Sequence, residues 1–214
     1  MFKAVQFSCA LLIVMNFSCR QPLSPKEKNK VTNAVQKSSI VIDIQPFRGM
    51  PAEETNYVFT ELKKVYPNII LKPAIPLPQS AFYIPRNRYR ADSLINFLAT
   101  KTADGHVMIG LTNKDISTNK GSIVDWGVMG LGFCPGRSCI ASTFRLTPAE
   151  KLMQLFKVAI HELGHTQGLP HCDVKTCFMR DAEGRNPTNE EKDFCADCKK
   201  FLENKGWNFT SQPK

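Results

Sequence analysis

Three of the four histidines in this 214-residue chain lie within eleven residues, at His161, His165 and His171. Because a helix has 3.6 residues per turn, His161 and His165 face the same side and can bind one metal ion. Glu162 is placed to hold a water molecule, and Gly168 permits a sharp turn that brings His171 to the same ion. Three imidazoles leave a fourth tetrahedral position open, which is the arrangement of a catalytic zinc rather than a structural one.

The chemistry that this pattern favours is hydrolysis of a peptide bond by a zinc-activated water. Zinc lowers the pKa of the water, and Glu162 acts as the general base that passes the proton to the leaving amine. One alternative is three surface histidines on an amphipathic helix. Another is a non-catalytic, zinc-stabilised peptide-binding module, which has no need for Glu162. The sequence is compatible with both exopeptidase and endopeptidase action.

Four cysteines follow in an equally ordered pattern, at Cys172, Cys177, Cys195 and Cys198. We predict a helix from near Thr188 to about Lys205, which would place the last two sulfurs on one side. Four thiolates form a closed, structural zinc site. Disulfides are the alternative in an exported protein. We favour the metal, and therefore expect two Zn²⁺ ions per chain.

These residues also carry a family resemblance. The chain reads HELGHTQGLPHC at residues 161–172, CFM at residues 177–179 and CADC at residues 195–198. This pattern resembles the archaemetzincins, a branch of the metzincin zinc peptidases, and the likeness extends over roughly Ile40 to Gly206. It implies a mixed αβ peptidase fold with an active-site cleft, a catalytic zinc on the three histidines and Glu162 as general base. It also implies a second zinc on the four cysteines.

The resemblance assigns two further roles. Met179 would be the Met-turn methionine beneath the catalytic metal. The edge strand along which a peptide substrate lies would be formed by Gly127, Val128, Met129, Gly130, Leu131, Gly132 and Phe133. The stretch between Met179 and the last cysteine pair is shorter than the corresponding stretch of the family pattern. The export signal predicted for residues 1–18, described below, is a second departure from that pattern.

The elements that must position these residues alternate between strands and helices. We predict strands at residues 39–44, 69–71 and 106–111, with helices between Pro51 and Pro67 and over residues 91–99. Such alternation favours parallel pairing. The fold class is therefore α/β (α+β mixed), a metzincin-like zinc peptidase domain. It would have a twisted mixed sheet with an edge strand, an active-site helix and a C-terminal zinc-bound helical segment.

The active-site helix has an explicit predicted start. Thr147, Pro148 and Glu150 form the pattern of a capping box, and Gly168 can end the helix. Upstream, residues 127–133 and 139–146 are predicted to form a hairpin, and a glycine-rich strand is typical of an edge that another backbone approaches.

Two cysteines and one histidine lie outside these motifs. Cys134 and Cys139 face each other across the predicted hairpin, where they would form either a disulfide or two small thiols. We interpret His106 as a surface or core histidine rather than a metal ligand.

The N-terminal residues predict export. Residues 1–18 have a basic start and an apolar stretch too short to span a bilayer, as in a lipoprotein-type signal peptide, with Cys19 as the lipidated residue. An ordinary cleaved signal or an uncleaved anchor is the alternative. Residues 19–38 would be a tether, 39–207 the peptidase domain and 208–214 a tail. The protein would be an exported, membrane-anchored lipoprotein on the periplasmic or cell-surface side.

The amino-acid composition excludes further classes of protein. With 43% hydrophobic and 22% charged residues, the chain is neither wholly disordered nor a multi-span membrane protein. The net charge of +9 would suit acidic partners, and the basic cluster at Arg86–Arg90 has aromatic neighbours. We interpret it as a solvated basic face and expect no nucleic acid. The expected partner is a peptide or protein substrate, and the expected state is a monomer.

Overall fold

The structure, a computed structural model, describes residues 39–182 and 184–210. The predicted signal peptide, the lipidated Cys19 and the tether lie outside these residues. The strands are β1 (Val41–Pro46), β2 (Ile69–Leu71), β3 (Phe82–Tyr83), β4 (Arg88–Arg90), β5 (His106–Thr112), β6 (Ile116–Lys120), β7 (Ile123–Val128), β8 (Gly130–Gly132) and β9 (Ser138–Ser142). The helices are α1 (Ala52–Val65), α2 (Ala91–Ala99), α3 (Lys151–Thr166) and α4 (Ala196–Asn204), with 3₁₀ turns at Gln79–Ala81, Ile84–Arg86 and Pro148–Glu150.

The main sheet has five strands in the order β2-β1-β5-β9-β8. Its first three pairings are parallel, whereas β8 runs antiparallel to β9. The predicted parallel core and mixed sheet are therefore confirmed. A smaller sheet has four strands in the order β3-β4-β6-β7.

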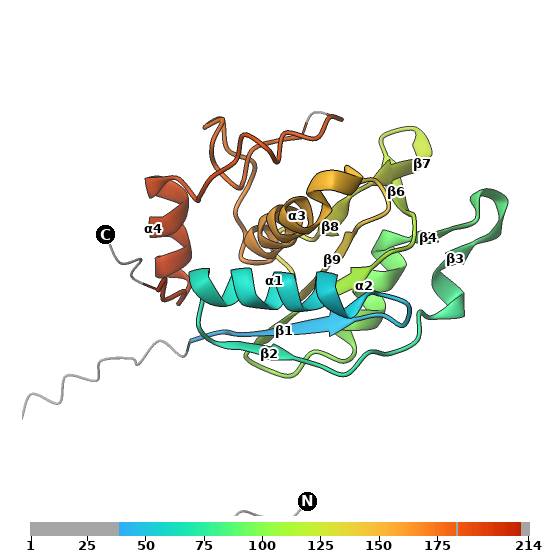
Figure 1. The fold of residues 1–214 in the computed structure, drawn as a ribbon, viewed down its shortest axis with the longest axis horizontal. Coiled ribbons are helices and arrows are strands. Elements are labelled where there is room, and N and C mark those ends of the chain that lie inside the picture. Colours follow the sequence, from blue (N-terminus) through green and yellow to red (C-terminus); the bar gives the residue numbers. More distant parts are fainter. Residues whose placement is uncertain (1–38, 183, 211–214) are drawn as a thin grey trace, which may run out of the picture. The chain divides into compact units, whose positions relative to one another are not determined.

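Alternation along the central strands distributes their side chains between two hydrophobic layers. Ile42 and Ile44 of β1 pack in one core with apolar residues of α1 and α3. Met108 of β5 and Ile140 of β9 point the other way and pack with residues of α2. Helices α1 and α3 thus cover one face of the sheet and α2 the other, as Figure 1 shows.

The start of α3 differs from the prediction. Thr147 makes no capping bond with its side chain, and a 3₁₀ turn precedes the helix, which begins at Lys151. The main-chain N–H of Thr147 instead donates to Oε1 of Gln154, over 2.9 Å. A buried glutamine one turn into the helix has taken the place of the glutamate of a capping box. At the other end Gly168 has a φ of +94°, so the predicted helix stop is confirmed.

The predicted hairpin is present, but its first strand is shorter than expected. Leu131 of β8 pairs with Ile140 of β9, and β8 is one of the two edge strands of the main sheet. Gly127 and Val128 belong instead to β7 in the smaller sheet, and Met129 lies between the two strands. The segment predicted as one edge strand therefore crosses from one sheet to the other.

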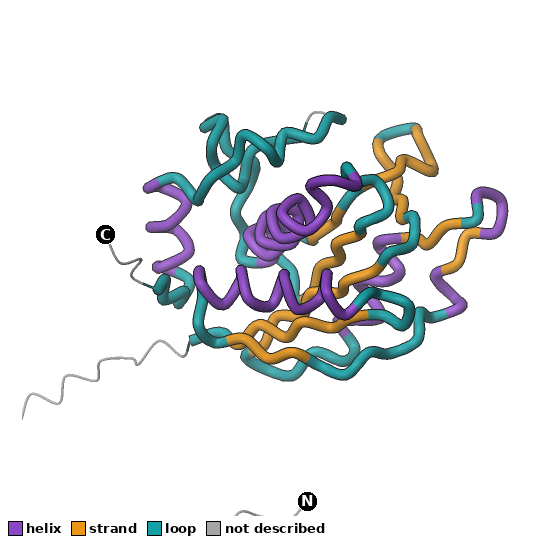
Figure 2. Tube along the Cα trace, in the orientation of Figure 1, coloured by secondary structure: helices purple, strands orange, loops and turns teal. Residues whose placement is uncertain are grey.

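The helix predicted from near Thr188 was wrong at its start, since α4 begins at Ala196. Between α3 and α4 the described residues form loops, drawn in teal in Figure 2. The main-chain groups of this segment bond to the preceding loop instead of to one another as in a helix. Lys192 N–H donates to the Thr176 carbonyl, and Phe178 N–H donates to the Asp193 carbonyl. Within the described ranges, none of the helices is long and apolar enough to cross a membrane.

Candidate active site and metal centres

The three histidines of the motif come together at the end of α3. His161 and His165 are one turn apart on the helix, and the turn at Gly168 brings His171 back beside them. One potential ligand atom from each ring lies within 4.8 Å of the others. The ring centroids are 4.6 to 5.4 Å apart. This grouping is the one that the spacing predicts.

Each imidazole has an acceptor beside its Nδ1 atom. Nδ1 of His161 lies 2.7 Å from the Phe178 carbonyl oxygen, and Nδ1 of His165 lies 2.8 Å from that of Leu169. A carbonyl can only accept, so each Nδ1 carries the proton and each Nε2 has a lone pair for a metal. Nδ1 of His171 faces a carboxylate, with Oδ2 of Asp181 at 3.2 Å.

The protonation of these imidazoles suits metal binding. Burial, with a smaller effect from His165, lowers the pKa of His161 to about 3. Burial also lowers the pKa of His165. A metal binds the neutral imidazole, so both rings are in the ligating form at physiological pH.

Glu162 lies against the edge strand. The residue is only 7% exposed, and burial raises its pKa to about 8. A Cβ added at Gly130 would be 2.6 Å from Oε1 of Glu162, and one at Gly132 would be 2.7 Å from its main-chain oxygen. The glycines of β8 therefore let the strand approach this carboxylate, a close contact that larger residues would prevent.

Met179, which the family resemblance makes the Met-turn methionine, packs against Gly164 of the histidine helix. It is fully buried, and a Cβ added at Gly164, between the two helical histidines, would clash with its sulfur. The glycine in the motif thus leaves room for the methionine, while Phe178 next to it supplies the carbonyl that orients His161.

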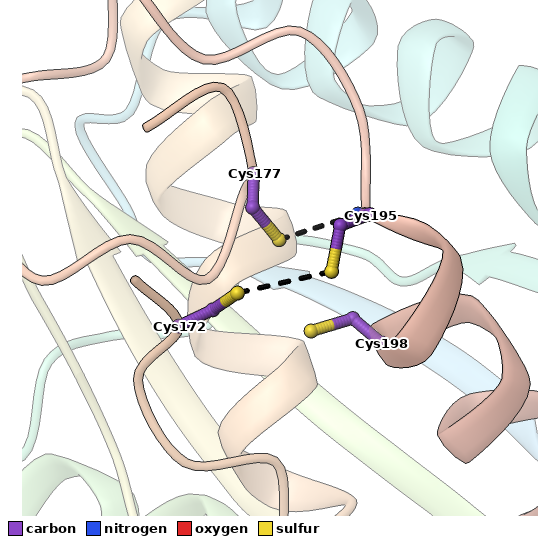
Figure 3. Close-up of side chains that lie close together, drawn as sticks. All are labelled: Cys172, Cys177, Cys195 and Cys198. Carbon is purple, nitrogen blue, oxygen red and sulfur yellow. Dashed lines mark hydrogen bonds between the residues drawn. The ribbon is translucent and has the colours of Figure 1, made fainter. Parts of the chain in front are cut away.

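The four cysteines converge from two segments, as Figure 3 shows. Cys172 and Cys177 come from the loop after α3, and Cys195 and Cys198 from the start of α4. All four sulfurs lie within 4.8 Å of one another. None of the four is in a disulfide.

The sulfur geometry fits a zinc ion. The sulfurs of Cys172 and Cys195 are 3.7 Å apart, and two sulfurs bound tetrahedrally to zinc at ~2.3 Å would be separated by ~3.8 Å. The main-chain N–H groups of Met179 and Cys195 donate to the Cys177 sulfur over 3.4 and 3.3 Å. Burial raises the pKa of Cys177 and Cys198, so a cation is needed to hold several thiolates together.

A cleft of about 670 Å³ contains the three histidines and Glu162. One wall is formed by residues 126–132, from the end of β7 through β8. The other is formed by α3 and the described residues of the segment after Met179, including Arg180, Thr188 and Glu191. Of the predicted substrate strand, Gly127 to Gly132 line the cleft, whereas Phe133 is not among its lining residues.

The residues outside the motifs have separate positions. Cys134 is exposed, Cys139 is buried, and both are free thiols, so the structure has no disulfide there. The Cys134 thiol donates to the Leu169 carbonyl over 3.3 Å. His106 is partly buried, with Nδ1 3.0 Å from Oδ2 of Asp43, and lies outside the cleft.

Sequence reasoning missed the groups that orient the site. The carbonyl oxygens of Leu169 and Phe178 leave no signal in residue type, since every residue has a carbonyl. Asp181 was detectable in principle, as a carboxylate close in sequence to a candidate Met-turn, and Glu191 was not distinguishable from neighbouring acidic residues.

Comparison with known proteins agrees with this geometry. Residues 39–204 match peptidase family M54. The archaemetzincin of Halobacterium salinarum is 29% identical over 175 residues, which cover 75% of this chain and 98% of that protein. The crystal structure of the Archaeoglobus fulgidus archaemetzincin, complexed with malonate, matches with a TM-score of 0.65 and 26% identity over 76% of this chain and 99% of that one. That of Methanopyrus kandleri matches with a TM-score of 0.67 and 25% identity, over 79% and 97%.

Proposed function

This chain belongs to peptidase family M54, the archaemetzincins, and is a zinc metallopeptidase; from that premise we propose that it hydrolyses peptide bonds with Glu162 as the general base. The observation that supports this role is the position of Glu162, which is buried beside the three histidines in the wall of the cleft. Burial raises its pKa to about 8, and a general base is most effective when its pKa lies near the operating pH.

His161, His165 and His171 would hold the catalytic zinc through their Nε2 atoms. When bound, zinc supplies a Lewis acid that lowers the pKa of water and polarises a carbonyl group. Glu162 takes a proton from the attacking water and delivers it to the leaving amine as the C–N bond breaks. The edge strand β8 offers main-chain groups that can pair with an extended peptide beside Glu162.

We also propose that each chain binds two zinc ions. The support is the pair of separate ligand groups, three imidazoles in the cleft and four thiolates next to α4. The second ion would be structural, because four protein ligands leave no position for water.

The export signal and the lipid on Cys19 remain proposals that rest on the sequence of residues 1–19. If they are right, the enzyme meets its peptide or protein substrates outside the cytoplasm, tethered to a membrane surface by residues 19–38.

The test of the proposed activity is a digest of a peptide library by purified, zinc-loaded protein, with products identified by mass spectrometry. We expect cleavage that a zinc chelator abolishes and added zinc restores. Absence of cleavage across the library in zinc-replete protein would reject the proposed function.

A further inference from the structure

The cleft beside the three histidines has a basic lining. Among the described residues that line it, five are cations, namely Lys120, Arg145, Lys157, Arg180 and Arg185. Three are acids, namely Glu162, Asp181 and Glu191. Two of these acids, Glu162 and Glu191, are buried, so the cations dominate the exposed part of the lining. Because charge complementarity selects between partners, such a cleft favours a substrate that carries negative charge.

Two of the five cations already donate to acceptors of the protein. The Lys157 ammonium donates to the main-chain oxygens of Thr188 and Glu191, at 2.6 Å each. Arg180 donates to the exposed carboxylate of Glu190 over 2.7 Å. These contacts fix the wall that follows Met179, and they leave recognition of a substrate to other cations.

Arg145 is held in place and still has donors free for a ligand. Its Nε donates to Oδ1 of Asp115 over 2.9 Å, and its Nη2 donates to Oδ2 over 3.1 Å. This two-point pairing fixes the plane of the guanidinium group. Within the described ranges, Nη1 donates to no acceptor, and the side chain is 34% exposed. Arg145 therefore keeps the two N–H donors of Nη1 for a ligand.

The carboxylate that fixes Arg145 does not neutralise it, because a second arginine shares that carboxylate. Nε of the buried Arg88 lies 3.0 Å from Oδ2 of Asp115. Among the described residues, four arginines share three aspartates in this network, namely Arg86, Arg88, Arg90 and Arg145 with Asp92, Asp115 and Asp125. Arg145 is the arginine of this network that lines the cleft, so part of the surplus positive charge lies where a substrate would bind.

The Arg145 guanidinium lies against Gly127, on the wall that leads to Glu162. A Cβ added at Gly127 would be 2.1 Å from Nη2 of Arg145, and one added at Gly130 would be 2.6 Å from Oε1 of Glu162. The two glycines are three residues apart in the chain, which is ~11 Å at most. An extended peptide rises ~3.3 Å per residue. A substrate residue about three positions or fewer from the bond beside Glu162 would therefore reach Arg145.

We propose that Arg145 binds a carboxylate of the substrate, about three residues or fewer from the cleaved bond. The carboxylate belongs either to an acidic side chain or to the free C-terminus of the peptide. This inference rests on the proposed function, and it names the substrate class. A carboxylate would accept from Nη1 in a charge-assisted hydrogen bond, which is roughly twice as strong as a neutral one. An amide of the same shape would gain much less.

The experiment measures peptide binding by calorimetry on the zinc-loaded Glu162→Gln protein, so that binding is read without turnover. One set of short peptides is blocked at both ends and carries glutamate or glutamine at each position in turn. A second set compares a free carboxylate with an amide at the C-terminus of the same sequences. We expect one carboxylate to bind about 10-fold more tightly than the matching amide. The set that shows this advantage identifies the source of the carboxylate.

Three further substitutions test whether Arg145 causes the advantage. Arg145→Met should reduce it to about twofold or less. Gly127→Ala keeps the charge but places a Cβ where the guanidinium lies, so it should also reduce the advantage. Arg137→Met is the matched control, because this exposed arginine pairs with Asp104 outside the cleft, and it should leave the advantage intact. A general loss of folding would weaken carboxylate and amide peptides alike and would not change their ratio.

Two results would overturn the inference. The first is equal binding of carboxylate and amide peptides in both sets. The second is an advantage that persists in Arg145→Met or in Gly127→Ala, which would assign the carboxylate to the bound metal or to another cation of the cleft. Cleavage of the same peptides by wild-type protein is scored separately. Cleavage without a carboxylate preference rejects only this inference, whereas carboxylate-selective binding without cleavage rejects only the proposed function.

Discussion

The Oδ2 atom of Asp181 lies 3.2 Å from Nδ1 of His171, the only one of the three motif histidines that faces a carboxylate rather than a main-chain carbonyl. His171 is also outside the helix that fixes the other two, and its side chain is 47% exposed. A carboxylate behind a ligating imidazole fixes the ring orientation and strengthens it as a ligand.

Asp181→Ala should therefore weaken zinc binding at the histidine site by about 10- to 100-fold, the usual effect of losing such a partner. The cysteine site should keep its metal. Zinc affinity is measured by competition with a chromophoric chelator. Asp104→Ala is the control, since that exposed carboxylate pairs with Arg137 and does not line the cleft. An affinity within twofold of wild type would show that Asp181 does not support His171.

Zinc binding by the four cysteines should strengthen zinc binding by the three histidines, because one loop carries residues of both sites. Cys172 follows His171 directly, and its N–H donates to the Met179 carbonyl over 2.8 Å. The same loop supplies the Phe178 carbonyl that orients His161. A structural zinc contributes ~10–16 kcal/mol, as much as the stability of a whole domain.

The double variant Cys195→Ser with Cys198→Ser should therefore lose activity and bind the catalytic zinc more weakly, although neither residue lies in the cleft. Zinc stoichiometry and turnover are measured together. Asp104→Ala, at an exposed carboxylate outside the cleft and outside the four-cysteine group, should change neither. One zinc retained with near-normal turnover in the double variant would mean that His171 is held independently of the cysteines.

Ionisation of the buried Glu191 side chain should lower the free energy of unfolding as the pH rises. Burial raises its pKa from 4.5 to about 7, with smaller opposing effects from Lys157 and Arg180. The folded state therefore binds the proton more tightly than the unfolded state, so its stability falls from about pH 4.5 to pH 7 and stays lower above that.

Glu191→Gln removes this titration. It should leave stability near that of wild type at pH 4.5 and raise it at pH 8 by on the order of 1–3 kcal/mol. Thermal unfolding of the zinc-loaded proteins at both pH values provides the measurement, with Glu190→Gln as the control. A variant that is less stable than the wild type at pH 8 would show that the buried Glu191 carboxylate does not destabilise the folded protein at that pH.

The proposed lipid on Cys19 should keep the protein in the membrane fraction of the cell. If Cys19 carries acyl chains, Cys19→Ala should move the protein from the membrane fraction to the soluble exported fraction, because buried acyl carbons provide the attachment. Cys9→Ala, within the apolar stretch of the same leader, should remain in the membrane fraction. Full-length wild-type protein in the cytoplasm would contradict both the lipid and the export proposals.

How far the sequence predicts this structure depends on whether the deciding forces are local. Helical spacing alone grouped His161 with His165, and the order of strands and helices predicted the parallel core around β1. The start of α4 could not be predicted, because the main chain of residues 188–194 bonds to α3 and to the cysteine loop instead of to itself.

The same limit applies within the site. Thr147 and Glu150 have the local pattern of a capping box, yet Gln154 takes the Thr147 N–H and also contacts the distant Asn186. Glu191 matters because α3 packs against its loop and excludes water from its carboxylate. Such burial is a property of the tertiary structure, so sequence spacing gives no sign of it.

The most direct test of the central claim is Glu162→Gln, which preserves side-chain size and leaves the three imidazoles unchanged. Zinc content and peptide hydrolysis are measured on the same preparations of wild-type and variant protein. We predict close to two zinc ions per chain in both, with hydrolysis in the variant reduced by ~10²-fold or more through loss of the general base. Full zinc content with unchanged hydrolysis would show that Glu162 is not the base.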